Sequence, residues 1–364
     1  MVSMSRRAFG KLLGTGVATA ALRPALAQAP APAPSSAATA VRLSANENPY
    51  GPCPGAIEAI RAACGRAWRY PDEAANELRA DLSRLHGLPA DWFRLGAGSG
   101  EILKLATSAF TGPGKRLVMA DPAFEAAGRH AETAGAQVTR VPLDGTYAHP
   151  LERMSAPDAG LVYVCNPNNP TASITPKARL RAFLDAAPCM VLVDEAYHHY
   201  VDSPDYETVA PLVKTQPRLI VTRTFSKIYG LAGARIGYAI AQPAVIEKLS
   251  AHASWDSVNI FAIAAARASL VDASWAEQGR RRNAATRAQV MRELAQRGFT
   301  AIPSQANFVM IETRRPVKPL ISALAERGVQ VGRLFPALPT HLRVTLGTPE
   351  QMERFLTAFA ALTA

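Results

Sequence analysis

The sequence predicts an α/β protein in which a large, doubly wound and mostly parallel sheet is followed by a smaller α+β domain. Between residues 55 and 251, short apolar runs alternate with helical patterns. The runs are hardly interrupted by polar residues, which is typical of parallel strands covered on both faces. After Trp255 the alternation ends, and long segments rich in Ala and Arg follow. These observations indicate two structural parts.

The expected elements follow in order along the chain. Helices are expected over residues 55–67, 72–86, 100–110, 124–134, 176–187 and 243–251. Strands are expected over residues 116–120, 137–142, 160–165, 189–194, 218–222 and 235–241. In the second part, helices are expected over residues 258–295 and 316–327, and strands over residues 299–302, 307–312 and 341–345. The N-terminal arm is expected to return to this second part.

Length and composition limit the possible classes. The chain has 364 residues, of which 48% are hydrophobic, so it can bury a sizeable core. Its net charge of +11 includes four cations before residue 30, where no acid occurs. The other cations form no basic run with interleaved aromatics, so nucleic-acid binding is not expected. The expected divisions are an export segment (1–29), a linker (30–40), an N-terminal arm (41–70), a large cofactor-binding domain (71–254) and a small domain (255–364).

The export segment has the pattern of a twin-arginine signal peptide. Two arginines at positions 6 and 7 are followed by Phe9 and Lys11, in the usual places of that motif. The weakly apolar stretch that follows is too short to span a bilayer as a stable helix. Small residues offer cleavage sites near Ala27 or Ala29. The mature protein is therefore expected in the periplasm without a stable membrane anchor, and the alternative is an amphipathic first helix.

The four cysteines have no metal-binding spacing, and no HExxH motif or His/Cys cluster occurs, so no metal site is expected. Cys165 and Cys189 lie in apolar runs and are expected to be buried thiols. Whether Cys53 and Cys64 pair after export stays open.

Polar side chains follow the predicted strands where they end, which is where doubly wound sheets bind ligands. Gly98, Ser99 and Gly100 lie between a strand and a helix, so backbone N–H groups and a hydroxyl could hold a phosphate there. Phe124 follows the next strand and offers an aromatic face. Taken alone, the first pattern is also that of a simple turn, and the second that of core packing.

The next strand ends are rich in amide and carboxylate groups. Residues 166–171 (Asn-Pro-Asn-Asn-Pro-Thr) contain more amides than a turn needs, and Asn169 is one of them. Asp194 ends a buried strand, where an unpaired carboxylate is costly, so a cationic partner is expected. That partner is either a protonated pyridine nitrogen or a nearby arginine. Tyr197 follows three residues later.

A lysine between phosphate-type ligands follows the strand expected at residues 218–222. Thr224 and Ser226 precede Lys227, and Arg235 comes eight residues after it. Lysine is rare at the end of a buried strand unless its amine is used or paired. Two hydroxyls and a guanidinium suit a phosphate, and the lysine between them is a candidate nucleophile. The alternative is a basic, solvated turn.

Taken together, these groups are what pyridoxal phosphate (PLP) requires. The two phosphate-type clusters would hold its phosphate, and Phe124 would stack on its ring. Asp194 would keep the pyridine nitrogen protonated, while Asn169 and Tyr197 would donate to the phenolic oxygen. Lys227 would attach the cofactor covalently and then move the proton of the substrate.

From Leu43 to the C-terminus, the chain resembles the fold-type I PLP-dependent aminotransferases of class I/II, and histidinol-phosphate aminotransferases most of all. The motifs that carry the resemblance occupy residues 43–52, 69–72, 166–171, 194–197, 225–235, 306–308 and 342–347. The resemblance implies a homodimer in which Tyr70 reaches the PLP phosphate of the partner subunit. It also implies that Arg343 binds a substrate carboxylate or phosphate, in a pocket shared with Asn169, Tyr50 and Arg333.

Several positions depart from the family pattern. Ala97 and Gly100 replace an asparagine and an aspartate, Phe124 replaces a tyrosine, and Ala172 replaces a glycine. None of these changes removes a catalytic atom. The export signal is the largest departure, because histidine biosynthesis is cytoplasmic, and an exported relative is expected to act on another amino compound.

The resulting hypothesis is a ping-pong aminotransferase that moves an amino group between an amino acid or amino phosphate and a 2-oxo acid. The alternatives are a PLP-dependent decarboxylase or lyase on the same fold, or an aromatic amino acid aminotransferase. A non-enzymatic PLP-carrying module would have no reason to retain Lys227, Asp194 and Tyr197 together.

Overall fold

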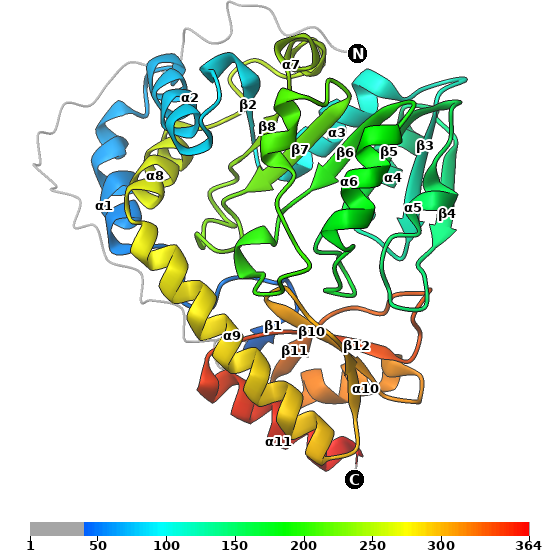
Figure 1. The fold of residues 1–364 in the computed structure, drawn as a ribbon. Helices are drawn as coiled ribbons and strands as arrows, with labels where there is room; N and C mark the ends of the chain where they lie inside the picture. The colour runs from blue at the N-terminus through cyan, green and yellow to red at the C-terminus, as the bar shows by residue number, and fades with distance from the viewer. Residues whose placement is uncertain (1–39, 364) are drawn as a thin grey trace, which may run out of the picture. The chain divides into compact units, whose positions relative to one another are not determined.

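A seven-stranded sheet with the strand order β2-β8-β7-β6-β5-β3-β4 forms the centre of the upper part of the molecule in Figure 1, in this computed structural model. The structure describes residues 40–363, so the predicted signal peptide lies outside the described residues. β8 runs antiparallel to β2 and β7, whereas the other neighbouring pairs are parallel. The predicted mostly parallel sheet is confirmed. Its strands are β2 (Phe93–Gly96), β3 (Arg116–Asp121), β4 (Val138–Pro142), β5 (Ala159–Cys165), β6 (Met190–Asp194), β7 (Leu219–Thr224) and β8 (Gly237–Ile240).

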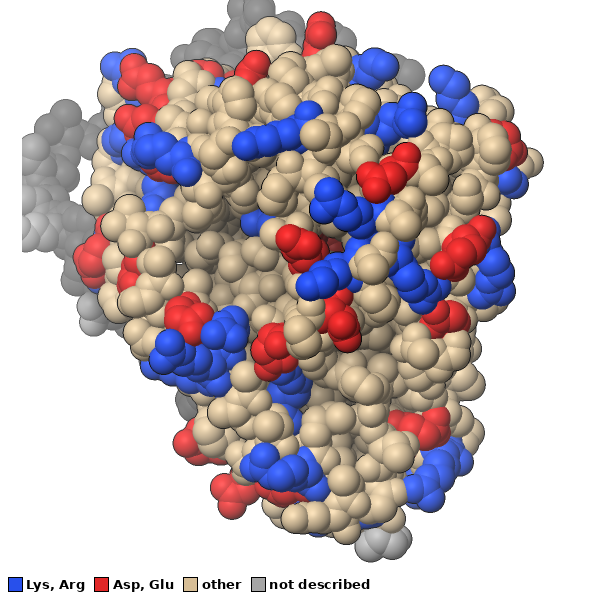
Figure 2. Space-filling model, in the orientation of Figure 1, with Lys and Arg blue, Asp and Glu red and all other residues tan. Residues whose placement is uncertain are grey.

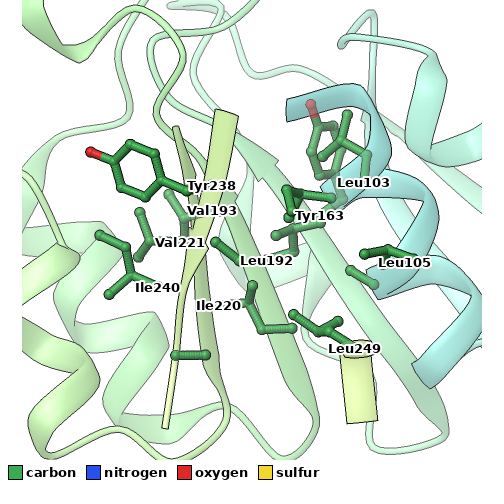
Figure 3. Packing of buried hydrophobic residues seen from close by; sticks show 14 of the residues in the cluster. Leu103, Leu105, Tyr163, Leu192, Val193, Ile220, Val221, Tyr238, Ile240 and Leu249 are labelled. Carbon is green, nitrogen blue, oxygen red and sulfur yellow. The ribbon is translucent and has the colours of Figure 1, made fainter. Parts of the chain in front are cut away.

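The middle strands are buried on both faces because their side chains alternate between two apolar layers. Leu192 pairs in register with Ile220, and Val193 with Val221, so each face of β6 and β7 presents branched side chains. Figure 3 shows these residues packed among Leu103 of α3 (Ser99–Phe110) and Leu249 of α7 (Pro243–Ser250). The polar groups of these strands are thereby confined to the strand ends.

The helices around the large sheet include one that the sequence assigned elsewhere. α8 (Ile260–Val271) packs against α1 (Pro54–Ala63) and α2 (Asp72–His86), and its buried residues belong to the core of the large sheet. Six of its twelve residues are buried, and small Ala side chains allow the close packing of α8 against its neighbours. The predicted domain boundary at residue 255 stays a prediction, but the packing of α8 and α1 does not follow it. The remaining helices beside this sheet are α4 (Ala126–Thr133), α5 (Leu151–Met154) and α6 (Lys177–Ala186).

A second hydrophobic cluster underlies the lower part of Figure 1. This part of the molecule contains a three-stranded antiparallel sheet, β12-β10-β9, and a parallel pair of strands, β1-β11. β1 comes from the N-terminal arm, so the arm returns to this part as expected. The elements are β1 (Val41–Leu43), β9 (Thr300–Ile302), β10 (Phe308–Glu312), β11 (Val329–Val331), β12 (His341–Thr345), α9 (Ala273–Gln296), α10 (Val317–Glu326) and α11 (Pro349–Thr363).

Two details refine the expected elements. The helical segment expected over residues 258–295 is divided at Asp272, whose side chain accepts a hydrogen bond from the N–H group of Trp275 and caps α9. Cys53 is buried, Cys64 is exposed, and both thiols are free. Between residues 40 and 363, no helix combines the length and the apolar character needed to cross a membrane.

Candidate active site

A cavity of about 370 Å³ opens where several strands of the large sheet end. The cavity also receives the arm segment (residues 44–47, which follow β1) and one residue of β12. Most of the predicted site residues line it, namely Ser99, Gly100, Phe124, Asn169, Asp194, Tyr197, Thr224, Ser226, Lys227, Arg235 and Arg343. The structure thus brings together side chains that lie up to 244 positions apart in the sequence (99 to 343).

Lys227 lies in the cavity with its amine directed at the arm segment. Its Nζ donates hydrogen bonds to the backbone carbonyls of Asn46 at 3.0 Å and Ala45 at 3.3 Å. Desolvation in the cavity, together with the nearby Arg343 cation, lowers the pKa of Lys227 to about 8. A considerable fraction of the amine is therefore neutral near physiological pH, as a proton-transferring base requires.

Asp194 is buried at the end of β6 and accepts two hydrogen bonds. Tyr163 Oη donates to Oδ2 at 3.0 Å, and the Ala196 N–H group donates to Oδ1 at 3.1 Å. Burial raises the pKa of Asp194 to about 6. No cation lies within ion-pairing distance of it among residues 40–363, so a cationic ligand group in front of it would be stabilised. Tyr163 was not predicted, although a tyrosine in a buried strand signals that its hydroxyl has a partner.

The part of the cavity around Ser226 contains groups that can bind an anion. Thr224 Oγ1 donates to Ser226 Oγ at 2.9 Å, and Arg235 Nη1 donates to the same Ser226 oxygen at 3.4 Å. The adjacent α3 begins at Ser99, so its free N–H groups add positive potential. Gly98 has φ 81°, a backbone conformation that residues with a Cβ rarely adopt, so this position favours glycine.

One further contact fixes the loop before α3. Glu101 Oε2 accepts hydrogen bonds from the Ala97 N–H group at 2.5 Å and from Ser257 Oγ at 2.8 Å. Sequence reasoning did not assign a role to Glu101. A glutamate in the first turn of a helix after a glycine-rich loop is the signal that could have identified it.

Arg343 reaches the cavity from β12. Its Nη1 donates to Asn169 Oδ1 at 2.7 Å, and its Nη2 donates to the Ser44 carbonyl at 2.8 Å. Its Nε is buried without a hydrogen-bond partner, and burial lowers the pKa of the guanidinium. A buried cation that is held only by neutral oxygens has capacity left for an anionic ligand.

Lys227, Arg235 and Arg343 thus line one cavity, and none of them forms an ion pair with a carboxylate of residues 40–363. The lining contains two carboxylates: Asp194, which is hydrogen-bonded as described, and Glu47, which pairs with Arg42 at 3.3 Å. On the face shown in Figure 2, Lys and Arg are interspersed with Asp and Glu. The concentration of unpaired positive charge is therefore a property of the cavity.

Four predicted residues do not line the cavity in the single chain: Gly98, which lies behind Arg235, and Tyr50, Tyr70 and Arg333. The Tyr50 ring lies against Arg282 of α9, with 4.8 Å from Cζ to the ring centroid. Tyr70 is 79% exposed beside the exposed Trp68. Arg333 is half-exposed and pairs with Glu125 at 2.6 Å.

Arg333 nevertheless lies close to Arg343, because both guanidinium groups contact the ring of Phe335. The distances from Cζ to the ring centroid are 4.4 Å for Arg333 and 5.0 Å for Arg343.

A buried ion pair supports the strand ends from behind and was also missed. Arg223 of β7 donates from Nε and Nη2 to Glu195 Oε2 at 3.1 and 2.9 Å, and Glu195 Oε1 accepts from the Val209 N–H group at 2.7 Å. Removing one partner of a buried pair leaves an uncompensated charge, so the pair fixes the ends of β6 and β7 relative to each other. The signal was an arginine between two threonines at the end of an apolar run.

The donor set fits the predicted PLP. A phosphate would meet the N-terminus of α3, two hydroxyls and Arg235. A ring placed against Phe124 would meet the carboxylate of Asp194, whose pKa is raised by burial. The amine of Lys227 lies in the same cavity.

Comparisons with known proteins agree with this arrangement. The chain matches the family described as Aminotransferase class I and II over residues 38–359. It is 41% identical to the histidinol-phosphate aminotransferase of Symbiobacterium thermophilum, covering 88% of this chain and 90% of that protein. A putative histidinol-phosphate aminotransferase structure from Erwinia carotovora atroseptica superposes with a TM-score of 0.85 and 31% identity, covering 89% and 96% of the two chains. The Sinorhizobium meliloti histidinol-phosphate aminotransferase in complex with pyridoxal-5'-phosphate gives a TM-score of 0.81 and 27% identity, covering 88% and 91%.

The raised pKa of Asp194 predicts a pH-dependent difference between the cofactor-free wild type and Asp194→Asn. Between about pH 4 and pH 6, an unfolded Asp194 has lost its proton while the folded one retains it, so rising pH favours unfolding of the wild type. The free energy of unfolding of the wild type should fall by about 2–3 kcal/mol relative to the variant over this range. Urea unfolding at a series of pH values measures it.

The exposed Asp91 provides the matched control, because Asp91→Asn makes the same chemical change without removing a buried carboxyl group. The amide of Asp194→Asn can keep both contacts, since the Tyr163 hydroxyl can accept as well as donate. A pH-independent difference for Asp194→Asn would mean that burial does not perturb this carboxyl group.

Proposed function

The chain belongs to the class I and II aminotransferase family, and on this premise we propose that it uses PLP to move an amino group from an anionic amino donor to a 2-oxo acid. One observation carries the proposal. Lys227, Arg235 and Arg343 surround a single cavity without ion-pair partners among residues 40–363, and Asp194 lies buried in the same cavity. That is more positive charge than a cofactor phosphate alone requires.

The residues that would hold the cofactor divide into three groups. Ser99, Gly100, Thr224, Ser226 and Arg235 would hold its phosphate. Phe124 would support the ring, and Asp194 its nitrogen; Asn169 and Tyr197 would donate to the phenolic oxygen. When bound, PLP supplies a carbonyl for covalent attachment and a ring that withdraws electrons from the substrate carbon.

Lys227 is the residue that moves the proton of the substrate. Its pKa of about 8 leaves part of the amine neutral, and the carbonyls of Asn46 and Ala45 hold the Nζ atom at a fixed place in the cavity. A base that is positioned in this way and poised near the working pH is effective in both directions of proton transfer. The same lysine therefore serves both halves of a ping-pong reaction.

Arg343 is the proposed anchor for the anionic group of donor and acceptor. Asn169 and Ser44 orient its guanidinium, and the planar group can bind a carboxylate or a phosphate by donating two parallel hydrogen bonds. The named relatives are histidinol-phosphate aminotransferases, so histidinol phosphate is the first donor to test. The proposed export favours a different amino compound, and aromatic amino acids are the next donors to test.

The decisive experiment combines a spectrum with a donor screen. Wild type loaded with PLP should show the absorption band of lysine-bound cofactor, and Lys227→Ala should lose that band. Anionic amino donors should convert the bound cofactor stoichiometrically to its amino form, with release of the 2-oxo product. A colourless wild type would refute the cofactor assignment, and release of carbon dioxide would identify a decarboxylase instead.

We also propose that the enzyme is a homodimer in which Tyr70 completes the cofactor phosphate site of the partner subunit. Tyr70 and Trp68 are 79% and 75% exposed beside a groove that is lined by residues 65–77, and large aromatics in that position favour an interface. A symmetric dimer would use the same groove twice.

A mixing experiment tests the shared site. Tyr70→Ala and Lys227→Ala should each be impaired alone. A mixed dimer has one site with both Lys227 and the partner's Tyr70 intact, so co-expression should restore part of the activity. If the mixture is no more active than its parents, although mixed dimers are isolated by differential tagging, Tyr70 does not act across subunits.

Finally, we propose export by the twin-arginine pathway. The support is the sequence alone, since residues 1–29 lie outside the described residues. In a host with this pathway, the wild type should appear in the periplasmic fraction, and replacement of both Arg6 and Arg7 by lysine should retain the folded enzyme in the cytoplasm. Equal distribution of the two proteins would refute the proposal.

A further inference from the structure

Asn46, in the arm segment, is one residue that contacts both Lys227 and Tyr197. Its carbonyl accepts from Lys227 Nζ at 3.0 Å, and its side-chain Nδ2 donates to Tyr197 Oη at 3.1 Å. Asn46 is 2% exposed and Tyr197 is 4% exposed, so their contact is shielded from water, whereas the contact to Lys227 is partly buried. Asn46 has φ 55°, a left-handed conformation that asparagine adopts more readily than most residues.

The Asn46 amide is held by its neighbour Thr345. The backbone N–H group of Asn46 donates to Thr345 Oγ1 at 2.9 Å. The Thr345 hydroxyl in turn donates to Asn46 Oδ1 at 3.2 Å, which leaves its proton off the backbone N–H group, since that group cannot accept. In this arrangement the NH₂ group of Asn46 faces Tyr197.

The direction of the Asn46 hydrogen bond determines what the Tyr197 hydroxyl proton can do. Because Tyr197 Oη accepts from Asn46, its own O–H group has to donate elsewhere, and no residue between 40 and 363 accepts it. Tyr197 lines the cavity, and its ring is fixed edge-on against Phe308 at 5.2 Å. The free O–H group is thus directed to whatever the cavity binds.

We propose that Asn46 is a positioning residue that makes Tyr197 a hydrogen-bond donor toward the cofactor. Thr345 of β12 holds the Asn46 amide in the orientation that this requires. This inference rests on the proposed function, because the acceptor of the Tyr197 proton would be the phenolic oxygen of PLP. A donor at that oxygen stabilises its anionic form and so lowers the pH at which the lysine-bound cofactor changes its absorption.

The test is a spectroscopic pH titration of PLP-loaded Asn46→Asp. An aspartate at this position accepts where asparagine donates, so the Tyr197 proton turns away from the cavity, while the backbone contact to Lys227 is unchanged. The titration midpoint should rise by about one pH unit, which corresponds to one ordinary hydrogen bond. Lysine attachment itself should persist, so both proteins should show the absorption band.

The double variant separates the hydrogen bond from the added charge. The charged and titratable groups that face Tyr197 are Lys227, Arg343, Asp194, Cys165 and Tyr200, and all remain in every variant. In a Tyr197→Phe background, Asn46→Asp should shift the midpoint much less than it does in the presence of Tyr197. An equal shift in both backgrounds would mean that charge acts directly, and the proposal would be wrong.

Asn48→Asp is the matched control, because it makes the same chemical change two positions along the arm. Asn48 Nδ2 donates to the Ile228 carbonyl at 2.8 Å and does not contact Tyr197, so any shift that it causes should be the same with and without Tyr197. If Asn46→Asp does not fold, Asn46→Gly replaces it, since glycine adopts φ 55° readily. It should produce a smaller rise that again requires Tyr197.

An unchanged midpoint in a folded, PLP-loaded Asn46 variant would overturn the inference. Failure of the wild type to bind PLP would instead refute the proposed function, and the two results are therefore distinguishable.

Discussion

The site depends on charges that the protein places in one cavity without neutralising them. Asp194 is held by a tyrosine hydroxyl and a backbone N–H group, and Arg343 by an amide and a carbonyl. Neutral hydrogen bonds orient these ions but leave much of their charge uncompensated. The folded protein therefore presents uncompensated charges that can bind an ionic ligand. The buried Glu195–Arg223 pair, which is neutral as a unit, fixes the strand ends that hold this arrangement.

The two hydrophobic clusters are joined through the arm segment rather than through their apolar surfaces alone. Ser44 accepts from Arg343, and the carbonyls of Asn46 and Glu47 accept from Asn307 Nδ2 at 3.0 and 3.2 Å. Asn46 then contacts Tyr197 and Lys227 on the other side of the cavity. The wall of the site is thus made of backbone carbonyls, whose positions depend on both parts of the molecule at once.

Sequence predicted the large sheet and the lining of the cavity well, because strand-end polar residues such as Asp194 and Lys227 stand out against apolar runs. It could not predict Asn46 or Tyr163, because their partners depend on contacts between distant segments. It also placed α8 with the second part, since an Ala-rich helix looks the same whether it is buried by one core or another. Tyr50, Tyr70 and Arg333 came from resemblance alone, and the single chain does not bring them into the cavity.

The parallel pairing of β1 with β11 joins residues 41–43 to residues 329–331. The strand that supplies Arg343 and Thr345 lies even closer to the end of the chain. During synthesis, the large sheet can assemble long before the ribosome has made these residues, but the cavity cannot close. Capture of a cofactor must therefore wait until Arg343 and Thr345 have been made. The arm is made early and its partner strands are made late. The site therefore forms after the large sheet, although the arm precedes that sheet in the sequence.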